Sequence, residues 1–268
     1  MDSTMLRVCV AGATGKMGIA VLREAESKGF QIVGAVEAPD NARIGRSLKG
    51  LGICDSETRI VGPDRISEAV ENADVYLTFT VPVAEVHNIP VVADLGKRII
   101  MGTTGFSEEQ NLEIRSSVSG KVPAVFSPNF SVGVNILFKL AKVLKSFPSD
   151  YDVSISEIHH TGKKDAPSGT AKRLGEIISD GRGYSRTVYG REGISPRKPG
   201  ELEMSALRVG GVPGIHNVIV AGPYEALNIE HIAFSRNVFA QGAVYAAEWI
   251  SKQDQARIFS MEDVLGLS

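Results

Sequence analysis

Cysteine is scarce in this chain of 268 residues, which holds only Cys9 and Cys54. The first lies in an expected strand and the second in a polar loop, and neither has a CxxC spacing or a nearby histidine. A disulfide framework and a zinc site are therefore not expected, and a reducing compartment fits this composition.

The chain also lacks a large excess of positive or negative charge, and it lacks long hydrophobic runs. The chain has 29 Lys and Arg against 31 Asp and Glu, so no strong field attracts nucleic acid or an anionic membrane surface. No apolar run approaches the roughly 18 residues that span a bilayer, and the first residues lead directly into a strand pattern without a leader segment. We expect a cytoplasmic protein that binds a small molecule, with no nucleic acid and no membrane among its partners.

Glycine is abundant by contrast, and in the first half of the chain it separates apolar runs from helical patterns. An apolar run at 6–11 leads through a Gly-rich turn and a helical segment to a second apolar run at 31–37, which is a βαβ unit. The same alternation continues through apolar runs at 74–80, 98–102 and 122–127 and helical segments at 84–94 and 107–118. Such alternation predicts a parallel sheet of the α/β class.

The pattern changes after about Asn129, where an apolar helix at about 132–144 precedes a strictly alternating strand at 151–160. Gly and Pro turns, rather than helices, separate the strand-like runs that follow. These runs lie at 201–209, 216–221 and 227–234. We expect a second α+β domain with an open sheet that is mixed or mostly antiparallel.

Two other segments complete the predicted organisation. Residues 181–200 are rich in Gly, Arg and Pro and are the best candidate for a mobile loop. The Ala-rich segment at 239–250 has large apolar residues at helical spacing, and we expect it to pack back on the first domain.

Three glycines indicate where a dinucleotide would bind. Gly12, Gly15 and Gly18 lie between a strand and a helix, where bare backbone and a positive helix end can approach a pyrophosphate. Thr14 stands where the commoner fingerprint has its middle glycine, so the motif alone also fits an ordinary tight turn. Glu37, at the end of the second strand, stands about where an acid accepts hydrogen bonds from the adenosine ribose, which strengthens the cofactor interpretation.

The acid at Glu37 favours a ribose diol over a 2′-phosphate. Ala38 follows it, so no adjacent arginine neutralises a phosphate, and Lys16 and Arg43 are the cations that remain for that task. We expect NADH to be used at least as well as NADPH.

Two later loops should face the nicotinamide, because open α/β sheets bind ligands outside the carboxyl ends of their strands. These loops are FTVP at 79–82 and GTTG at 102–105. Their hydroxyls, on Thr80, Thr103 and Thr104, suit that role together, although Thr and Gly are also routine turn residues.

The segment EIHHTGKKDAPSGTA at 157–171 is the most informative stretch, because it joins two histidines, a cationic loop and a helix start. Ser168 and Gly169, at that helix start, offer N–H groups to a carboxylate, and Lys163 adds positive charge, so a dianionic substrate is expected. Histidine and lysine can supply the proton that hydride transfer to an unsaturated carbon needs. The plainer alternative is a solvated loop before a capped helix. A metal site is not expected, since adjacent histidines on a strand point to opposite faces.

Six segments spread over the chain carry motifs that occur together in one family. They are VAGATGKMG, FTVP, GTTG, SPNFSVGVN, EIHHTGKKDAPSGTA and SRNVFAQGAVYAAEW. From Val8 to about Leu267 the chain thus resembles the 4-hydroxy-tetrahydrodipicolinate reductase family, and the HHxxKxDAPSGTA pattern is its most specific mark.

The resemblance implies a Rossmann-like dinucleotide-binding domain at 1–129 that is completed by 237–268, and a substrate-binding and oligomerisation domain at 130–236 of a homotetramer. It implies His159 as proton donor or acceptor and Lys163 as proton donor, with His160, Gly169 and Thr170 as substrate contacts beside Ser168. The expected residues around NADH or NADPH, from the loops and the resemblance together, are Gly12, Ala13, Thr14, Gly15, Lys16, Met17, Glu37, Phe79, Thr80, Gly102, Thr103, Thr104, Ser127, Pro128, Asn129 and Phe130.

The implied reaction passes hydride to a ring carbon of the dehydrated substrate while Lys163 protonates the neighbouring position, in the diaminopimelate route to lysine. This chain departs from the family at Ile215 and Asn217, where an acidic residue commonly precedes His-Thr, and at Ala38, where some members carry a basic residue. Two alternatives are a dehydrogenase of another small carboxylate, amino acid or sugar on the same two-domain plan, and a non-catalytic dinucleotide sensor. Neither needs the HHTGKKDAPSGT segment.

Overall fold

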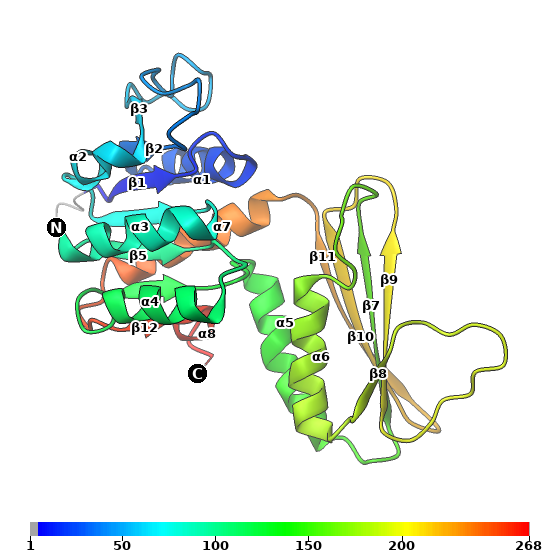
Figure 1. Ribbon diagram of the computed structural model, residues 1–268. Coiled ribbons are helices and arrows are strands. Elements are labelled where there is room, and N and C mark those ends of the chain that lie inside the picture. Colours follow the sequence, from blue (N-terminus) through cyan, green and yellow to red (C-terminus); the bar gives the residue numbers. More distant parts are fainter. Residues whose placement is uncertain (1–4, 268) are drawn as a thin grey trace. The chain divides into compact units, whose positions relative to one another are not determined.

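The computed structural model describes residues 5–267, and the chain divides into two compact units (Figure 1). One unit comprises Met1–Ser131 together with Asn237–Ser268, and the other comprises Val132–Arg236. Each unit has its own sheet and its own apolar core.

The first unit is built on a parallel sheet of seven strands in the order β12-β6-β5-β4-β1-β2-β3. These strands are β1 (Arg7–Ala11), β2 (Gln31–Val36), β3 (Ile60–Val61), β4 (Val75–Thr78), β5 (Arg98–Met101), β6 (Ala124–Phe126) and β12 (Ile258–Phe259). The order reverses between β1 and β4, which is the place where doubly wound sheets bind ligands. The α/β class expected from the sequence is confirmed.

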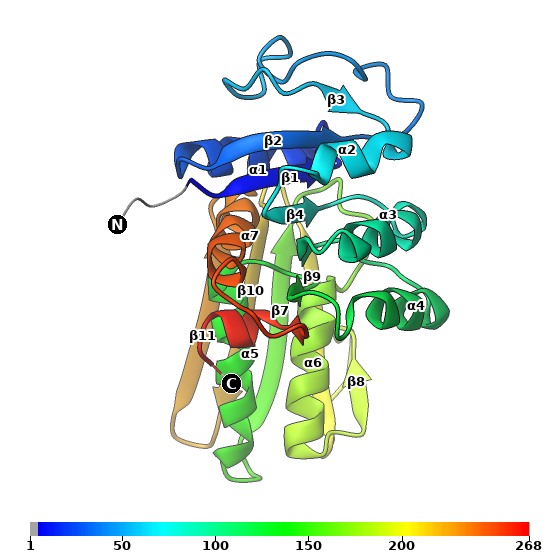
Figure 2. The same ribbon diagram turned by 90° about the vertical axis from the view of Figure 1, so that its left-hand side faces the viewer.

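Helices cover both faces of this sheet, and for that reason its strands are apolar throughout rather than alternating (Figures 1 and 2). One face carries α1 (Lys16–Ser27), α7 (Asn237–Ile250) and α8 (Met261–Val264). The other carries α2 (Ile66–Val70), α3 (Pro82–Asp94) and α4 (Glu108–Val118). As the sequence predicts, the late helix α7 packs in the core of the first unit, where its alanines let it approach α1 closely.

The second unit has a mixed sheet of five strands in the order β11-β10-β7-β9-β8, with α5 (Val132–Val143) and α6 (Gly169–Arg182) side by side on one face (Figures 1 and 2). The strands are β7 (Asp152–His159), β8 (Arg186–Val188), β9 (Glu201–Arg208), β10 (Gly214–Ala221) and β11 (Ala226–Ala233). The expected mixed sheet is confirmed, since two of its strand pairs are antiparallel and two are parallel. The β7–β9 and β8–β9 pairs are parallel. Helix α6 provides the crossover after β7, and the segment at 189–200 provides the crossover from β8 to β9.

The segment at 181–200 is tied to the second sheet by two arginines. Arg191 pairs with Glu201 at 2.8 Å and with Glu203 at 2.7 Å, and Arg197 donates to the carbonyl of Val153 at 3.1 Å. Part of the segment is strand β8, so the structure gives it more order than a plain loop; its mobility stays a prediction. None of the helices between residues 5 and 267 is long and apolar enough to cross a membrane.

Candidate active site

Gly12 brings the loop after β1 against the loop after β4. Its φ of +72° is in the left-handed region, and a Cβ there would lie 2.6 Å from the carbonyl oxygen of Phe79. Gly18 is equally constrained, since a Cβ would lie 2.0 Å from the carbonyl oxygen of Gly12. The glycine spacing therefore lets α1 start directly against the carboxyl end of β1.

The start of α1 is open to an anion. Its N-cap residue is Gly15, and no side chain caps the first turn. The N–H groups of Lys16 and Met17 in that turn have no earlier helical carbonyl to bind, so they are available to an oxyanion such as a phosphate. This geometry fits the pyrophosphate of a dinucleotide.

Glu37 accepts hydrogen bonds from the glycine loop, residues 12–15. Its Oε2 accepts hydrogen bonds from the N–H and the hydroxyl of Thr14, each at 2.8 Å, and its Oε1 accepts the N–H of Ala38 at 3.0 Å. A carboxylate has about four acceptor positions, so roughly one is left for a ribose hydroxyl. Arg43 donates to the carbonyl of Thr14 at 3.3 Å, which places an exposed cation at the same loop.

A pocket of about 660 Å³ opens between the carboxyl ends of β1, β2 and β4. Gly12, Gly15, Glu37, Phe79 and Thr80 line it, which brings these expected cofactor residues together. Sequence reasoning missed its other walls, which lie in loops and on the outer side of α3 and carry no motif. These are Pro39, Pro63, Val83, Ala84 and His87, among others.

Several other expected cofactor residues shape the loops through contacts of their own. The hydroxyl of Thr103 accepts the N–H of Thr80 at 2.9 Å, and the Ser127 hydroxyl donates to the carbonyl of Asn129 at 2.7 Å. Gly102 lies under the ring of Phe79, where a Cβ would come within 2.1 Å of a ring carbon. That ring meets Phe130 edge to face at 5.8 Å between centroids. Thr104 and Pro128 are exposed.

In the second unit, a buried carboxylate organises the start of the segment at 157–171. Glu157 is fully buried on β7, and its two oxygens accept hydrogen bonds from Arg208, at 3.0 Å each, and from the N–H of Ser168, at 3.0 Å. Its Oε2 also contacts Nδ1 of His159. Burial by itself raises the pKa of Glu157, but these hydrogen bonds outweigh it and hold the pKa below the ordinary value. The group is therefore an ionised carboxylate at neutral pH.

His159 belongs to a cluster of histidines on the inward face of the sheet. Its ring centroid lies 5.1 Å from that of His216, which in turn lies 6.4 Å from that of His231. Burial lowers the pKa of His159. Burial also lowers the pKa of His216, to about 4, and the neighbouring His159 adds to this shift. These rings are therefore neutral at physiological pH. Within residues 5–267, no group of three or more His, Cys, Asp or Glu side chains is arranged so that it could hold a metal ion.

The remaining residues expected at the catalytic centre lie on the exposed side of the same segment. His160 Nε2 is 3.2 Å from Nη2 of Arg236, and Lys163 pairs with Asp165 at 2.8 Å. Adjacent His159 and His160 thus take different partners, as strand alternation requires. Arg236 is a cation that the sequence analysis missed, although it lies in the SRNVFAQGAVYAAEW motif.

The first residues of α6 contact the buried histidine cluster on one side and are exposed to solvent on the other. The Ser168 hydroxyl accepts the N–H of Ala171 at 3.2 Å and lies 3.1 Å from Nε2 of His216. Gly169 is exposed and a Cβ there would meet no atom within 4 Å, so a ligand can approach the first turn. Thr170 is half-buried next to it.

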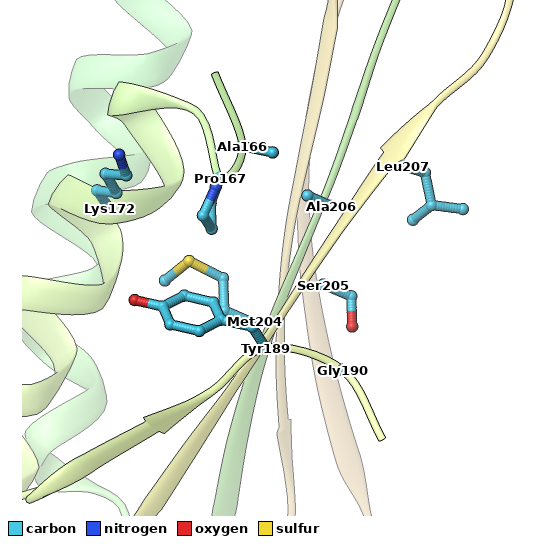
Figure 3. A pocket seen from close by; sticks show the side chains of 9 residues that line it. All are labelled: Ala166, Pro167, Lys172, Tyr189, Gly190, Met204, Ser205, Ala206 and Leu207. Atoms are coloured by element: carbon cyan, nitrogen blue, oxygen red, sulfur yellow. The ribbon is translucent and has the colours of Figure 1, made fainter. Parts of the chain in front are cut away.

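A second pocket, of about 540 Å³, lies beside the Pro167 turn, where residues of α6, of β9 and of the segment after β8 line it (Figure 3). Tyr189, Met204 and Lys172 surround it, and none of the residues expected to bind cofactor or substrate lines it. It is therefore distinct from the His159 cluster.

The two departures on β10 leave the histidine cluster intact. Ile215 and Asn217 alternate with His216, so they lie on the open face of the sheet, where Ile215 pairs with Ile158 and Ile232. The register is regular through this stretch, although Nδ1 of His216 and Oδ1 of Asn217 are buried without a hydrogen-bond partner among the described residues.

Comparisons with known proteins decide the family. The model of the dihydrodipicolinate reductase N-terminus matches residues 6–130, and the model of its C-terminus matches residues 133–265. The chain belongs to this family. The 4-hydroxy-tetrahydrodipicolinate reductase of Methanosarcina barkeri is 43% identical, and the alignment covers 98% of this chain and all of the relative. That of Geotalea daltonii is 40% identical over the same share of the chain.

The solved structures agree on the fold. A dipicolinate-bound dihydrodipicolinate reductase from Paenisporosarcina sp. TG-14 matches with a TM-score of 0.76 at 22% identity, over 96% of this chain and 98% of that one. An amine dehydrogenase from Mycobacterium smegmatis matches with a TM-score of 0.64 at 15% identity, over 94% of each chain. The family expected from the motifs is confirmed, and with it an NAD(P)H-dependent oxidoreductase of the lysine and diaminopimelate pathway.

Proposed function

We propose that the chain reduces 4-hydroxy-tetrahydrodipicolinate to tetrahydrodipicolinate with NADH or NADPH. The observation that carries the proposal is the junction at Ser168, where a neutral histidine cluster, a buried carboxylate and the open start of α6 meet beside exposed cations. In this proposal, residues 1–129 and 237–268 hold the dinucleotide, and residues 130–236 hold the substrate and form the contacts between subunits.

The reduced dinucleotide, when bound, supplies the hydride. Gly12 and Gly15 leave room for its pyrophosphate against the first turn of α1, and Glu37 offers its remaining acceptor position to a ribose hydroxyl. The loops with Thr80 and Thr104, after β4 and β5, then border the reactive end of the cofactor.

The substrate carries two carboxylates, and the site offers two kinds of partner for them. The N–H groups of Gly169 and Thr170 at the start of α6 bind one by hydrogen bonds and by the helix dipole. Lys163 and the His160–Arg236 pair bring positive charge for the other. The substrate first loses its 4-hydroxyl group as water. Lys163 then delivers a proton to the ring position next to the carbon that takes the hydride, so the dehydrated ring gains one hydride and one proton.

The open face of the second sheet supports a homotetramer. Large apolar side chains are exposed on this face and at its rim, which is unusual for a surface that stays in water. They include Leu207, Ile219, Ile232 and Phe234. Light scattering of the purified chain tests this, and a monomer at micromolar concentration contradicts it. A cytoplasmic location belongs to the same proposal.

The decisive experiment follows oxidation of NADH and NADPH by absorbance, with substrate made in place from pyruvate and aspartate semialdehyde by a coupled synthase. Lys163→Ala should lower kcat by about 10²- to 10⁴-fold, the usual contribution of a general acid, while NADH binding stays intact. The matched control is the exposed neighbour, Lys164→Ala, which should keep kcat within a few-fold. A folded wild-type chain that binds NADH but oxidises neither cofactor contradicts the proposal.

Cofactor choice gives a second test. Because Glu37 disfavours a 2′-phosphate and Arg43 is the cation at the glycine loop, Arg43→Ala should raise KM for NADPH several-fold and leave KM for NADH nearly unchanged. Arg46→Ala, in the same exposed loop, is the control. Equal effects of Arg43→Ala on both cofactors would show that Arg43 does not contact the 2′ position.

A further inference from the structure

His159 is held by a carboxylate on its own strand, and only the catalytic role of His159 rests on the proposed function. Glu157 and His159 are two residues apart on β7, so their side chains lie on the same inward face of the sheet. We propose that Glu157 is a positioning residue that fixes the tautomer of His159, with the proton on Nδ1 and the lone pair on Nε2, and ties the ring to the start of α6.

The donors around Glu157 fix the direction of each hydrogen bond. Oε1 accepts Nη2 of Arg208 and the N–H of Ser168, and Oε2 accepts Nη1 of Arg208 and meets Nδ1 of His159. An ionised carboxylate only accepts, so Nδ1 carries the hydrogen and Nε2 of the neutral ring is an acceptor. His159 therefore offers an acceptor to the substrate, and Lys163 is the donor.

A glycine lies beside that acceptor. Nε2 of His159 faces Gly214 on β10, where a Cβ would lie only 3.1 Å away. Any larger residue at position 214 would press on the ring, so the glycine protects the orientation that Glu157 sets. His216 packs edge to face on the other part of the ring.

Burial, with help from Lys163 and Arg208, keeps the pKa of His159 low beside a charged carboxylate. The charges that face His159 are Glu157 on its own strand, Arg208 on β9 and Lys163 in the following loop, with neutral His216 on β10. Arg208 pairs with both oxygens of Glu157 and cancels much of its field. Burial first, then Lys163 and Arg208, lower the pKa of His159, while Glu157 acts to raise it.

The same carboxylate sets the substrate-binding turn. Its hydrogen bond to the N–H of Ser168 holds the N-cap of α6, and the Ser168 hydroxyl lies against His216. A shift of Glu157 would thus move the His159 ring and the N–H groups of Gly169 together. A buried Glu–Arg pair with a purely structural role needs neither the contact with His159 nor the hydrogen bond from Ser168.

The closing experiment combines NMR and kinetics. In the wild-type chain labelled with ¹⁵N-histidine, with His159 assigned from the spectrum of His159→Asn, the ring should be neutral at neutral pH with the proton on Nδ1. A proton on Nε2 overturns the inference whether or not the chain is active, so this readout stands apart from the proposed function.

Glu157→Gln should lower kcat on the order of 10²-fold with KM for NADH unchanged, because the amide offers an N–H to Nδ1 and removes the charge. Since Glu157 raises the pKa of His159, the acid limb of the pH profile should also move to lower pH in this variant. Glu157→Asp should recover part of kcat. A kcat within threefold of wild type and an unmoved limb overturn the inference.

Glu201→Gln is the matched control, since Glu201 is also buried in this sheet, pairs with an arginine at 2.8 Å, and has no histidine partner among its described contacts. This variant should leave the acid limb of the pH profile at the same pH as in the wild-type chain. If Glu157→Gln does not fold, the NMR readout on the wild-type chain decides alone.

Discussion

Each unit of the chain buries one glutamate completely, and the two glutamates behave in opposite ways. Glu85 on α3 receives hydrogen bonds from the hydroxyls of Thr78, at 2.6 Å, and Thr80. Glu157 on β7 receives them from Arg208, His159 and a backbone N–H. Burial raises the pKa of Glu85, whereas the pKa of Glu157 is lowered in spite of burial.

The difference shows that partners, rather than burial alone, decide the direction in which the pKa of a buried acid moves. Two hydroxyls cannot replace the water that a carboxylate loses, and Oε2 of Glu85 has no hydrogen-bond partner among the described residues. A guanidinium and two further donors can replace it. Glu85 thus holds the loop after β4 as a group whose pKa is raised, and Glu157 holds the His159 cluster as a group whose pKa is lowered.

Removing the cation should have the largest effect. Arg208→Met leaves Glu157 buried without its main partner and should lower the free energy of unfolding by about 3 kcal/mol at neutral pH, measured by urea unfolding with circular dichroism. The matched control is Arg173→Met, which breaks an exposed pair with Glu176 and should cost under about 0.5 kcal/mol. A similar small cost for both variants would mean that Glu157 does not depend on Arg208 for its charge.

The sequence predicted the architecture where patterns are long enough to read. The buried strands of the first unit and the alternating strand at β7 were found, because apolar runs and alternation survive over several residues. Strands β3, β8 and β12, of two or three residues, were missed, since so short a segment has no measurable period.

The site was predicted only where a motif marked it. His159 and Ser168 were expected from their segment, but Glu157 and Arg208 were not, although each breaks an apolar series on the inward face of its strand. Those series run Val153, Ile155, Glu157 on β7 and Leu202, Met204, Ala206, Arg208 on β9. The register that brings Arg208 opposite His159 joins strands far apart in sequence, and no single strand encodes it.

The contributions of Glu157 and Glu85 to the free energy of unfolding should change with pH in opposite directions. Glu157 has a lowered pKa when folded, so its contribution is present above the unfolded pKa of about 4.3 and is lost as pH falls through the folded value. Glu85 has a raised pKa, so its contribution is present below the unfolded value and is lost as pH rises through the folded one.

The measurement compares urea unfolding of the wild-type chain with that of Glu157→Gln and Glu85→Gln across the acidic range. The wild-type advantage over Glu157→Gln should grow with pH, and its advantage over Glu85→Gln should shrink. Parallel curves for the two variants would contradict the comparison.

The smallest expected effect comes from one hydroxyl of the Glu85 network. Thr80→Val keeps the shape of the side chain and the backbone hydrogen bond to Thr103 but removes a donor to Glu85. A typical hydrogen bond contributes about 1 kcal/mol net, so the free energy of unfolding should fall by about that amount, with a rise in KM for NADH of no more than about fivefold. Thr80→Ser, which keeps the hydroxyl, is the control. A loss of about 3 kcal/mol would instead mean that Glu85 is ionised, because hydrogen bonds to a buried charge are stronger, and the contrast between the two glutamates would then be one of partner type alone.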